Sequence, residues 1–135
     1  MVKLRLRRKG RKAHAIYDVV AVDGRARRDG AFLERLGWYD PHQKPSKFEI
    51  SHEKAIKWLN SGAQPTEVVQ LLLSYDGVLL RRHLEFKKKS TDEIEALVAK
   101  HKAVTAARYH RREKLRAKRK EEKAKAEAKA KAEAN

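Results

Sequence analysis

The sequence predicts an α+β fold: a small mixed β-sheet of three to five strands packed with two short helices, plus a basic C-terminal extension that is helical or disordered. Strand patterns fill residues 1–50, and helical periodicity with capping residues follows in 51–76 and again after 90. From residue 116 onward the chain is almost wholly Ala, Lys, Arg and Glu, so it has no apolar face to bury. Strands first and helices after indicate a sheet with helices on one face.

The first two strands have the clearest patterns. Residues 2–7 alternate apolar and basic residues, and this period of two places the apolar side chains on one face and the cations on the other. After a loop around Gly10, residues 16–22 are β-branched and aromatic, which predicts a second strand paired with the first.

A basic loop and two further strands come next. Residues 23–30 place three arginines between two Asp-Gly pairs, which is typical of a loop. Residues 32–39 return to strand character, and prolines at 41 and 45 break the pattern before a short strand at 48–50. The expected faces of the third strand are Phe32, Leu36 and Trp38 on one side and Leu33, Arg35 and Tyr39 on the other.

Helices are expected in the second half of the chain. Ser51 and Thr66 are N-cap candidates because each hydroxyl could accept from an early helical amide, and apolar residues at helical spacing follow both. Residues 78–80 could be a short strand or an apolar plug. A capping-box sequence at 90–93 predicts another helix from about Asp92 toward Arg112 or beyond.

The charge points to a polyanionic partner. The 135 residues hold 34 Lys and Arg against 18 Asp and Glu, for a net charge of +16. A polyanion, either nucleic acid or an anionic lipid surface, is the partner such a charge favours. The expected organisation is an RNA-binding α+β domain at 1–82, a linker and amphipathic basic helix at 83–115, and a tail at 116–135 that is disordered or a solvated helix.

Several classes of function are disfavoured. The chain has no Cys, no apolar run approaching the roughly 20 residues of a membrane span, and no signal or transit pattern at its N-terminus, so we expect an aqueous, reducing compartment. The six histidines lack metal-ligand spacing, and no phosphate-binding glycine loop or nucleophile elbow is present. We therefore expect no catalytic residue, metal, cofactor, small-molecule substrate or membrane partner. Acidic residues that could form a metal-dependent nuclease site on paper are Asp18, Asp23, Asp29, Glu34 and Asp40.

The features that favour RNA are a rigid row of cations and a loop of arginine forks. The first strand would supply the row, and Arg25, Arg27 and Arg28 would hold phosphates bidentately. Tyr17 and Tyr39 lie beside these elements in sequence and could stack on bases. Helix-turn-helix DNA readers are mostly helical, whereas this chain opens with sheet, which favours structured RNA read by shape and phosphate.

Four segments resemble one family, the sixteenth protein of the bacterial small ribosomal subunit. They are residues 1–10 (MVKLRLRRKG), 17–23 (YDVVAVD), 28–41 (RDGAFLERLGWYDP) and 55–66 (AIKWLNSGAQPT). The resemblance implies an α+β, non-catalytic protein that binds small-subunit ribosomal RNA, mainly in its 5′ domain, contacts neighbouring ribosomal proteins and supports subunit assembly in the cytoplasm. The family commonly has Pro where this chain has Ala15, and it usually ends near residue 80–90, so nothing carries over to 90–135.

The two basic loops at 8–14 and 24–28, with the first strand, are therefore expected to clamp phosphates where RNA helices converge. The predicted RNA-binding residues are Lys3, Arg5, Arg7, Arg8, Lys9, Arg11, Lys12, His14, Tyr17, Arg25, Arg27, Arg28, Arg35 and Tyr39. The alternatives are a metal-dependent nuclease, a non-ribosomal RNA-binding chaperone, and a membrane-surface protein that uses residues 92–115. The sequence does not separate a bacterial from an organellar ribosome.

Overall fold

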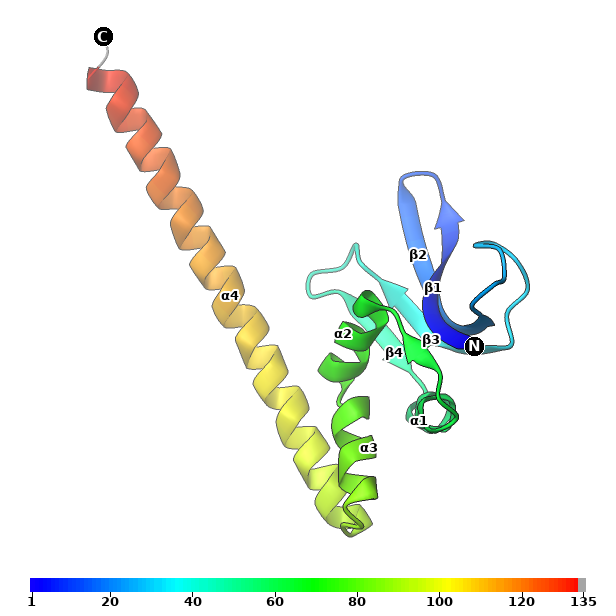
Figure 1. The fold of residues 1–135 in the computed structure, drawn as a ribbon. Coiled ribbons are helices and arrows are strands. Elements are labelled where there is room, and N and C mark those ends of the chain that lie inside the picture. The colour runs from blue at the N-terminus through cyan, green and yellow to red at the C-terminus, as the bar shows by residue number, and fades with distance from the viewer. Residues whose placement is uncertain (134–135) are drawn as a thin grey trace. The chain divides into compact units, whose positions relative to one another are not determined.

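The fold is α+β, as the sequence predicts, with a five-stranded mixed sheet in the order β4-β3-β2-β1-β5 (Figure 1). The computed structural model describes residues 1–133, which divide into a compact unit at 1–102 and a second unit from 103 onward. The strands are β1 (Val2–Arg11), β2 (His14–Asp23), β3 (Glu34–Asp40), β4 (Lys47–Ile50) and β5 (Gln64–Pro65). Neighbouring strands are antiparallel except β5, which runs parallel to β1.

Strands β1 and β2 form a long hairpin with a two-residue turn. Their register runs from Val2 opposite Asp23 to Arg11 opposite His14, and Ala13 in the turn has a φ of 66°. Gly10, with a φ of 93°, is required here because a Cβ would lie 2.5 Å from the carbonyl oxygen of His14. Only residues 17–21 of β2 pair with β3, so the hairpin extends beyond the rest of the sheet (Figure 1).

The hairpin buries apolar side chains on both faces. Leu4, Val19 and Ala21 belong to the core under the helices. Val20 and Val22 are also buried, but on the opposite face, between the basic side chains of β1. The segment 24–33 is tied to this hairpin by backbone hydrogen bonds from Gly24 to Met1 and from Leu33 to Ala21.

Strand β3 differs from its predicted faces. It begins at Glu34 rather than Phe32, and both Phe32 and Leu33 are exposed. A bulge in the β2–β3 register between Val19 and Val20 shifts the alternation by one residue. As a result Leu36 and Tyr39 both face the core, whereas the register places Arg35 and Trp38 on the face of Asp18 and Val20.

The predicted helices form, and one further helix was missed. The helices are α1 (His52–Asn60), α2 (Glu67–Asp76), α3 (Val78–Phe86) and α4 (Thr91–Glu133). Ser51 and Thr66 occupy the N-cap positions, but neither side chain accepts a capping hydrogen bond. The prediction of a strand or plug at 78–80 is wrong, because Gly77 ends α2 in the left-handed conformation and the apolar residues after it open α3.

The start of α4 is part of the first unit. Ile94 is buried. The Nζ atom of Lys102 lies 2.7 Å from one carboxylate oxygen of Asp76, and the Nε2 atom of His52 lies 3.0 Å from the other. The helix continues to Glu133, and residues 134 and 135 of the predicted tail lie outside the described residues. Within residues 1–133, none of the helices has the length and apolar character that a bilayer span requires.

Candidate nucleic-acid interface

Most of the predicted RNA-binding residues lie on the β1–β2 hairpin. The register places Lys3, Arg5, Arg7 and Lys9 on one face of β1, opposite Val22, Val20, Asp18 and Ile16 of β2. Arg8 faces the other side, opposite Tyr17. Antiparallel pairing over ten residues of each strand makes a rigid frame, so the spacing between these cations is set by the strand itself.

Arg5 binds the protein rather than offering its guanidinium to solvent. It donates to the backbone carbonyls of Ala26 at 3.4 Å and Arg28 at 3.3 Å, and also to that of Arg27. Three carbonyls of one loop thus converge on a single guanidinium, which has enough donors to satisfy them all. Arg5 therefore positions the loop at 24–28 against the hairpin.

The neighbouring Arg7 supports the same loop from the next position on this face. Its guanidinium carbon lies 5.1 Å from the centre of the Phe32 ring, a cation–π distance. The contact partly covers the exposed ring and fixes the far end of the segment 24–33. Two cations of the predicted row are thus engaged with the loop. Lys3 and Lys9 make no side-chain hydrogen bond or ion pair in the described part of the chain, although the stem of Lys3 lies beside Gly24.

The loop carries its three arginines on the surface. Arg25, Arg27 and Arg28 are all exposed, and the backbone N–H of Arg25 donates to the Asp23 carboxylate at 3.0 Å. Arg28 makes a two-pronged hydrogen bond to Asp29 at 3.0 to 3.3 Å, which raises the pKa of Arg28 and lowers the pKa of Asp29. Because this pair is highly exposed, it contributes little to stability, and a phosphate can compete for the same fork.

The tip of the hairpin gathers exposed cations beside a second loop. Arg8, Lys9, Arg11, Lys12 and His14 are all exposed. The His14 ring stacks on His42 with centroids 4.3 Å apart, so the loop after β3 lies against the tip. Sequence reasoning missed His42, because no local pattern shows that residues 28 positions apart meet.

Asp40 holds the loop that carries His42. Its carboxylate accepts from the backbone N–H of His42 at 2.9 Å and from the Gln43 side chain at 3.0 Å. The hydrogen bond from the His42 backbone is the main reason why the pKa of Asp40 is lowered, with the Gln43 hydrogen bond adding to it. The loop is therefore fixed at its first residues by an ionised carboxylate.

The two predicted tyrosines lie together, and both are half-buried. Tyr17 and Tyr39 are opposite each other across β2 and β3, with ring centroids 6.3 Å apart. Tyr39 packs against the hydrophobic core, which limits its use as a stacking surface. Arg35, also predicted to bind RNA, pairs at 2.9 Å with Asp18, whose side chain is largely buried.

The carboxylates considered for a nuclease site are each occupied by a separate partner. The partners are Arg35 for Asp18, the Arg25 backbone for Asp23, Arg28 for Asp29, Trp58 and Lys54 for Glu34, and His42 and Gln43 for Asp40. Across the part of the chain that the structure describes, no three His, Asp or Glu side chains come together as a metal site. The arrangement gives the nuclease alternative no candidate centre.

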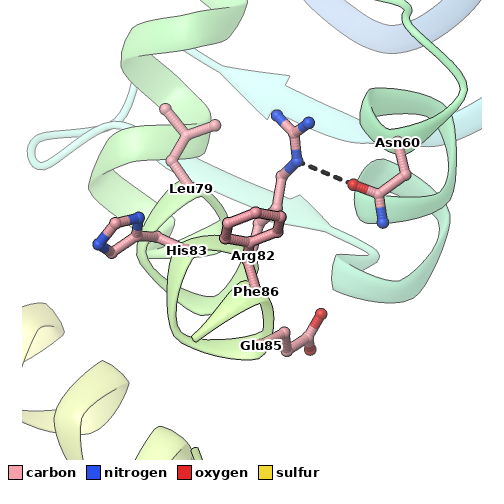
Figure 2. A pocket seen from close by; sticks show the side chains of 6 residues that line it. All are labelled: Asn60, Leu79, Arg82, His83, Glu85 and Phe86. Atoms are coloured by element: carbon pink, nitrogen blue, oxygen red, sulfur yellow. Dashed lines mark hydrogen bonds between the residues drawn. The ribbon is translucent and has the colours of Figure 1, made fainter. Parts of the chain in front are cut away.

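A separate hollow of about 520 Å³ lies between α1 and α3 (Figure 2). Arg82 crosses it and donates to the Asn60 side chain at 2.9 Å, while Phe86 is 87% exposed. Arg82 also donates to the Leu59 carbonyl at 3.3 Å, so its guanidinium ties α3 to the end of α1. This hollow has none of the predicted site residues in its lining.

Comparison with known proteins gives one consistent result. The family described as Ribosomal protein S16 matches residues 8–66. The small ribosomal subunit protein bS16 of Amoebophilus asiaticus is 50% identical over 97 residues, covering 70% of this chain and 82% of the relative. That of Chloroherpeton thalassium is 49% identical over 94 residues, covering 70% of each chain.

A third relative extends the similarity into α4. The bS16 protein of Prosthecochloris aestuarii is 43% identical over 120 residues, which is 89% of each chain, so the alignment passes residue 102. These relatives are structural proteins of the ribosome and not enzymes, which sets the nuclease alternative aside. With relatives 43–50% identical along most of their own length, the chain belongs to the ribosomal protein S16 family.

Proposed function

We propose that this chain binds small-subunit ribosomal RNA through the hairpin and the loop at 24–28, and that it supports assembly of the subunit in the cytoplasm. The observation that carries the proposal is the loop of three exposed arginines held to a rigid hairpin by Arg5. RNA helices repel one another when they converge, and cations fixed between them offset that repulsion. Neighbouring ribosomal proteins are the other partners we expect.

The proposed contacts depend on whether each basic side chain is already bound within the protein. Lys3, Lys9, Lys12 and Arg11 would hold phosphates as part of the hairpin, and Arg25 and Arg27 would do so from the loop. Arg28 would exchange Asp29 for a phosphate, and Arg5 and Arg7 would act by holding the loop. RNA binding is assigned to residues 1–82, with 83–115 and 116–135 kept as the helical linker and tail.

The decisive experiment compares affinity for a 5′-domain transcript of small-subunit RNA across a range of salt concentrations. Replacing Arg25, Arg27 and Arg28 with Ala removes three phosphate contacts, so the slope of log affinity against log salt is expected to flatten by about 2–3. Replacing exposed Lys47, Lys57 and Lys87 with Ala removes the same charge elsewhere on this unit and is expected to leave the slope nearly unchanged. Equal slopes for the arginine variant and the wild type would refute the assignment.

A further inference from the structure

The part of α4 beyond residue 102 is a helix with a large excess of basic side chains. Between 103 and 126, where side chains are described, there are ten Lys and Arg against three Glu, and no residue is buried. Large apolar side chains in this stretch are confined to Val104, Tyr109 and Leu115. The helix therefore neither contributes to a core nor carries the apolar seam of a coiled coil or the apolar face of a membrane-surface helix.

Four arginines of this helix share one face. Arg108, Arg112, Arg116 and Arg119 are spaced four, four and three residues apart, which keeps them within one stripe at 3.6 residues per turn. We call these four residues the arginine stripe. At a rise of about 1.5 Å per residue, successive members lie about 4.5 to 6 Å apart along the axis.

Acidic residues flank the stripe but form no ion pair with it among the described residues. None of its four arginines forms an ion pair with a described residue, and all four are exposed. Glu113 and Glu122 flank this face, three residues from Arg116 and Arg119 respectively, whereas Glu121 lies on another face at 100° per residue. Like charges four residues apart destabilise an isolated helix, so the spacing of Arg108, Arg112 and Arg116 is unfavourable without an anionic partner.

We propose that the arginine stripe is a second RNA-binding surface, which lies along the phosphates of an RNA strand independently of the hairpin. This inference rests on the proposed function and names the partner of the extension. A regular row of guanidinium forks matches a regular row of phosphates, which carry one charge per nucleotide. Binding would also remove the repulsion between the arginines and so stabilise the helix.

The test uses the full chain and two variants with the same loss of charge. The stripe variant is R108Q/R112Q/R116Q/R119Q, and the matched control is R111Q/K114Q/K118Q/K125Q, which neutralises four exposed cations on another face of the same stretch. Gln is a good helix former, so both helices are expected to persist, and circular dichroism checks this. Affinity for the 5′-domain transcript is measured against salt for each protein.

The stripe variant is expected to bind about tenfold more weakly than the control and to have a salt slope lower by about 2–3. Amide hydrogen exchange within 103–126 is expected to slow when RNA is added to the wild type but not to the stripe variant. A third variant with Lys at all four positions should keep most of the salt slope but lose affinity, because Lys lacks the bidentate fork.

Four outcomes would overturn the inference. Equal losses in the stripe and control variants would show that only the total charge matters. Wild-type affinity of the stripe variant for RNA, together with its loss from assembled subunits, would assign the stripe to a protein partner. Failure of the wild-type chain to bind RNA would overturn the proposed function as well, whereas wild-type binding with an ineffective stripe substitution would count against the stripe alone.

Discussion

Arg5 directs its hydrogen bonds at the protein, although it belongs to the same row of cations as Lys3 and Lys9. Its guanidinium binds the carbonyls of residues 26–28, while the side chains of Arg27 and Arg28 are exposed. Under the proposed function, a residue with this geometry would act on RNA binding through the loop. Its charge alone, read from the sequence, would assign it to a phosphate.

A double-mutant cycle distinguishes these two roles of Arg5. The Arg5→Ala change should weaken RNA binding, but adding it to the Arg25, Arg27 and Arg28 substitutions should cause little further loss, because both changes remove the same positioned loop. Lys3→Ala provides the control, since its contribution should add to that of the loop. Additive losses for Arg5 would mean that it contacts phosphate directly.

At the scale of elements, the loop after β3 depends on one ionised carboxylate. The backbone N–H of His42 and the side chain of Gln43 hold the pKa of Asp40 below its usual range. The folded state therefore favours the ionised form of the Asp40 carboxylate. Its stabilising effect is present above the unfolded pKa of about 3.9 and is lost as the pH falls through the lower, folded value.

Asp40→Asn is accordingly expected to reduce stability at pH 7 and to reduce the fall in stability between pH 5 and pH 2. The measurement is the urea midpoint of the wild type and the variant at each pH. Glu34, whose pKa is also lowered by the Trp58 hydrogen bond and by Lys54, continues to titrate in both proteins and serves as the internal reference. An unchanged pH dependence in the variant would refute the role of Asp40.

The elements with strict alternation or caps could be predicted, and those set by distant contacts could not. The alternation of residues 2–7 predicts β1 and its two faces, and the capping-box sequence at 90–93 predicts the start of α4. The bulge between Val19 and Val20 depends on how two strands pair. The local sequence pattern of β3 therefore could not predict the one-residue shift of its faces. Gly37 shows the same limit, because a Cβ there would lie 2.0 Å from the Glu49 carbonyl oxygen on another strand.

Residue type identifies the candidate cations, but their contacts within the protein could not be predicted from the sequence. The arginines at 25, 27 and 28 are exposed, as a phosphate contact requires. The tie from Arg5, the pairing of Arg35 with Asp18, and the stacking of His42 on His14 join segments well separated in sequence. Such contacts follow from the folded register, which composition and spacing do not specify.

At the scale of the whole molecule, the two compact units are stabilised by different interactions. Residues 1–102 contain the buried apolar side chains and the contacts of Asp76 with His52 and Lys102. Residues 103–126 have only the hydrogen bonds of their own helix and a few side-chain contacts. Helices without a packed face open locally at low free-energy cost.

Limited trypsin digestion of the free chain is therefore expected to cleave first between Arg108 and Lys125 and to leave a resistant fragment of about residues 1–102. Mass spectrometry identifies the fragment. Addition of RNA should slow cleavage in 108–125 if the arginine stripe is occupied. First cleavage within the hairpin, at Arg8 or Arg11, would contradict the expected difference in stability between the two units.

The position of β1 in the sheet has a consequence for synthesis of the chain. The first strand to be made lies between β2 and β5, yet β5 is not complete until residue 65. During translation one edge of β1 therefore stays open, and beyond Lys3 and Leu4 it stays open in the finished fold too. Basic side chains along an open edge discourage pairing with other chains. We therefore expect the row of cations to discourage aggregation of the newly made protein.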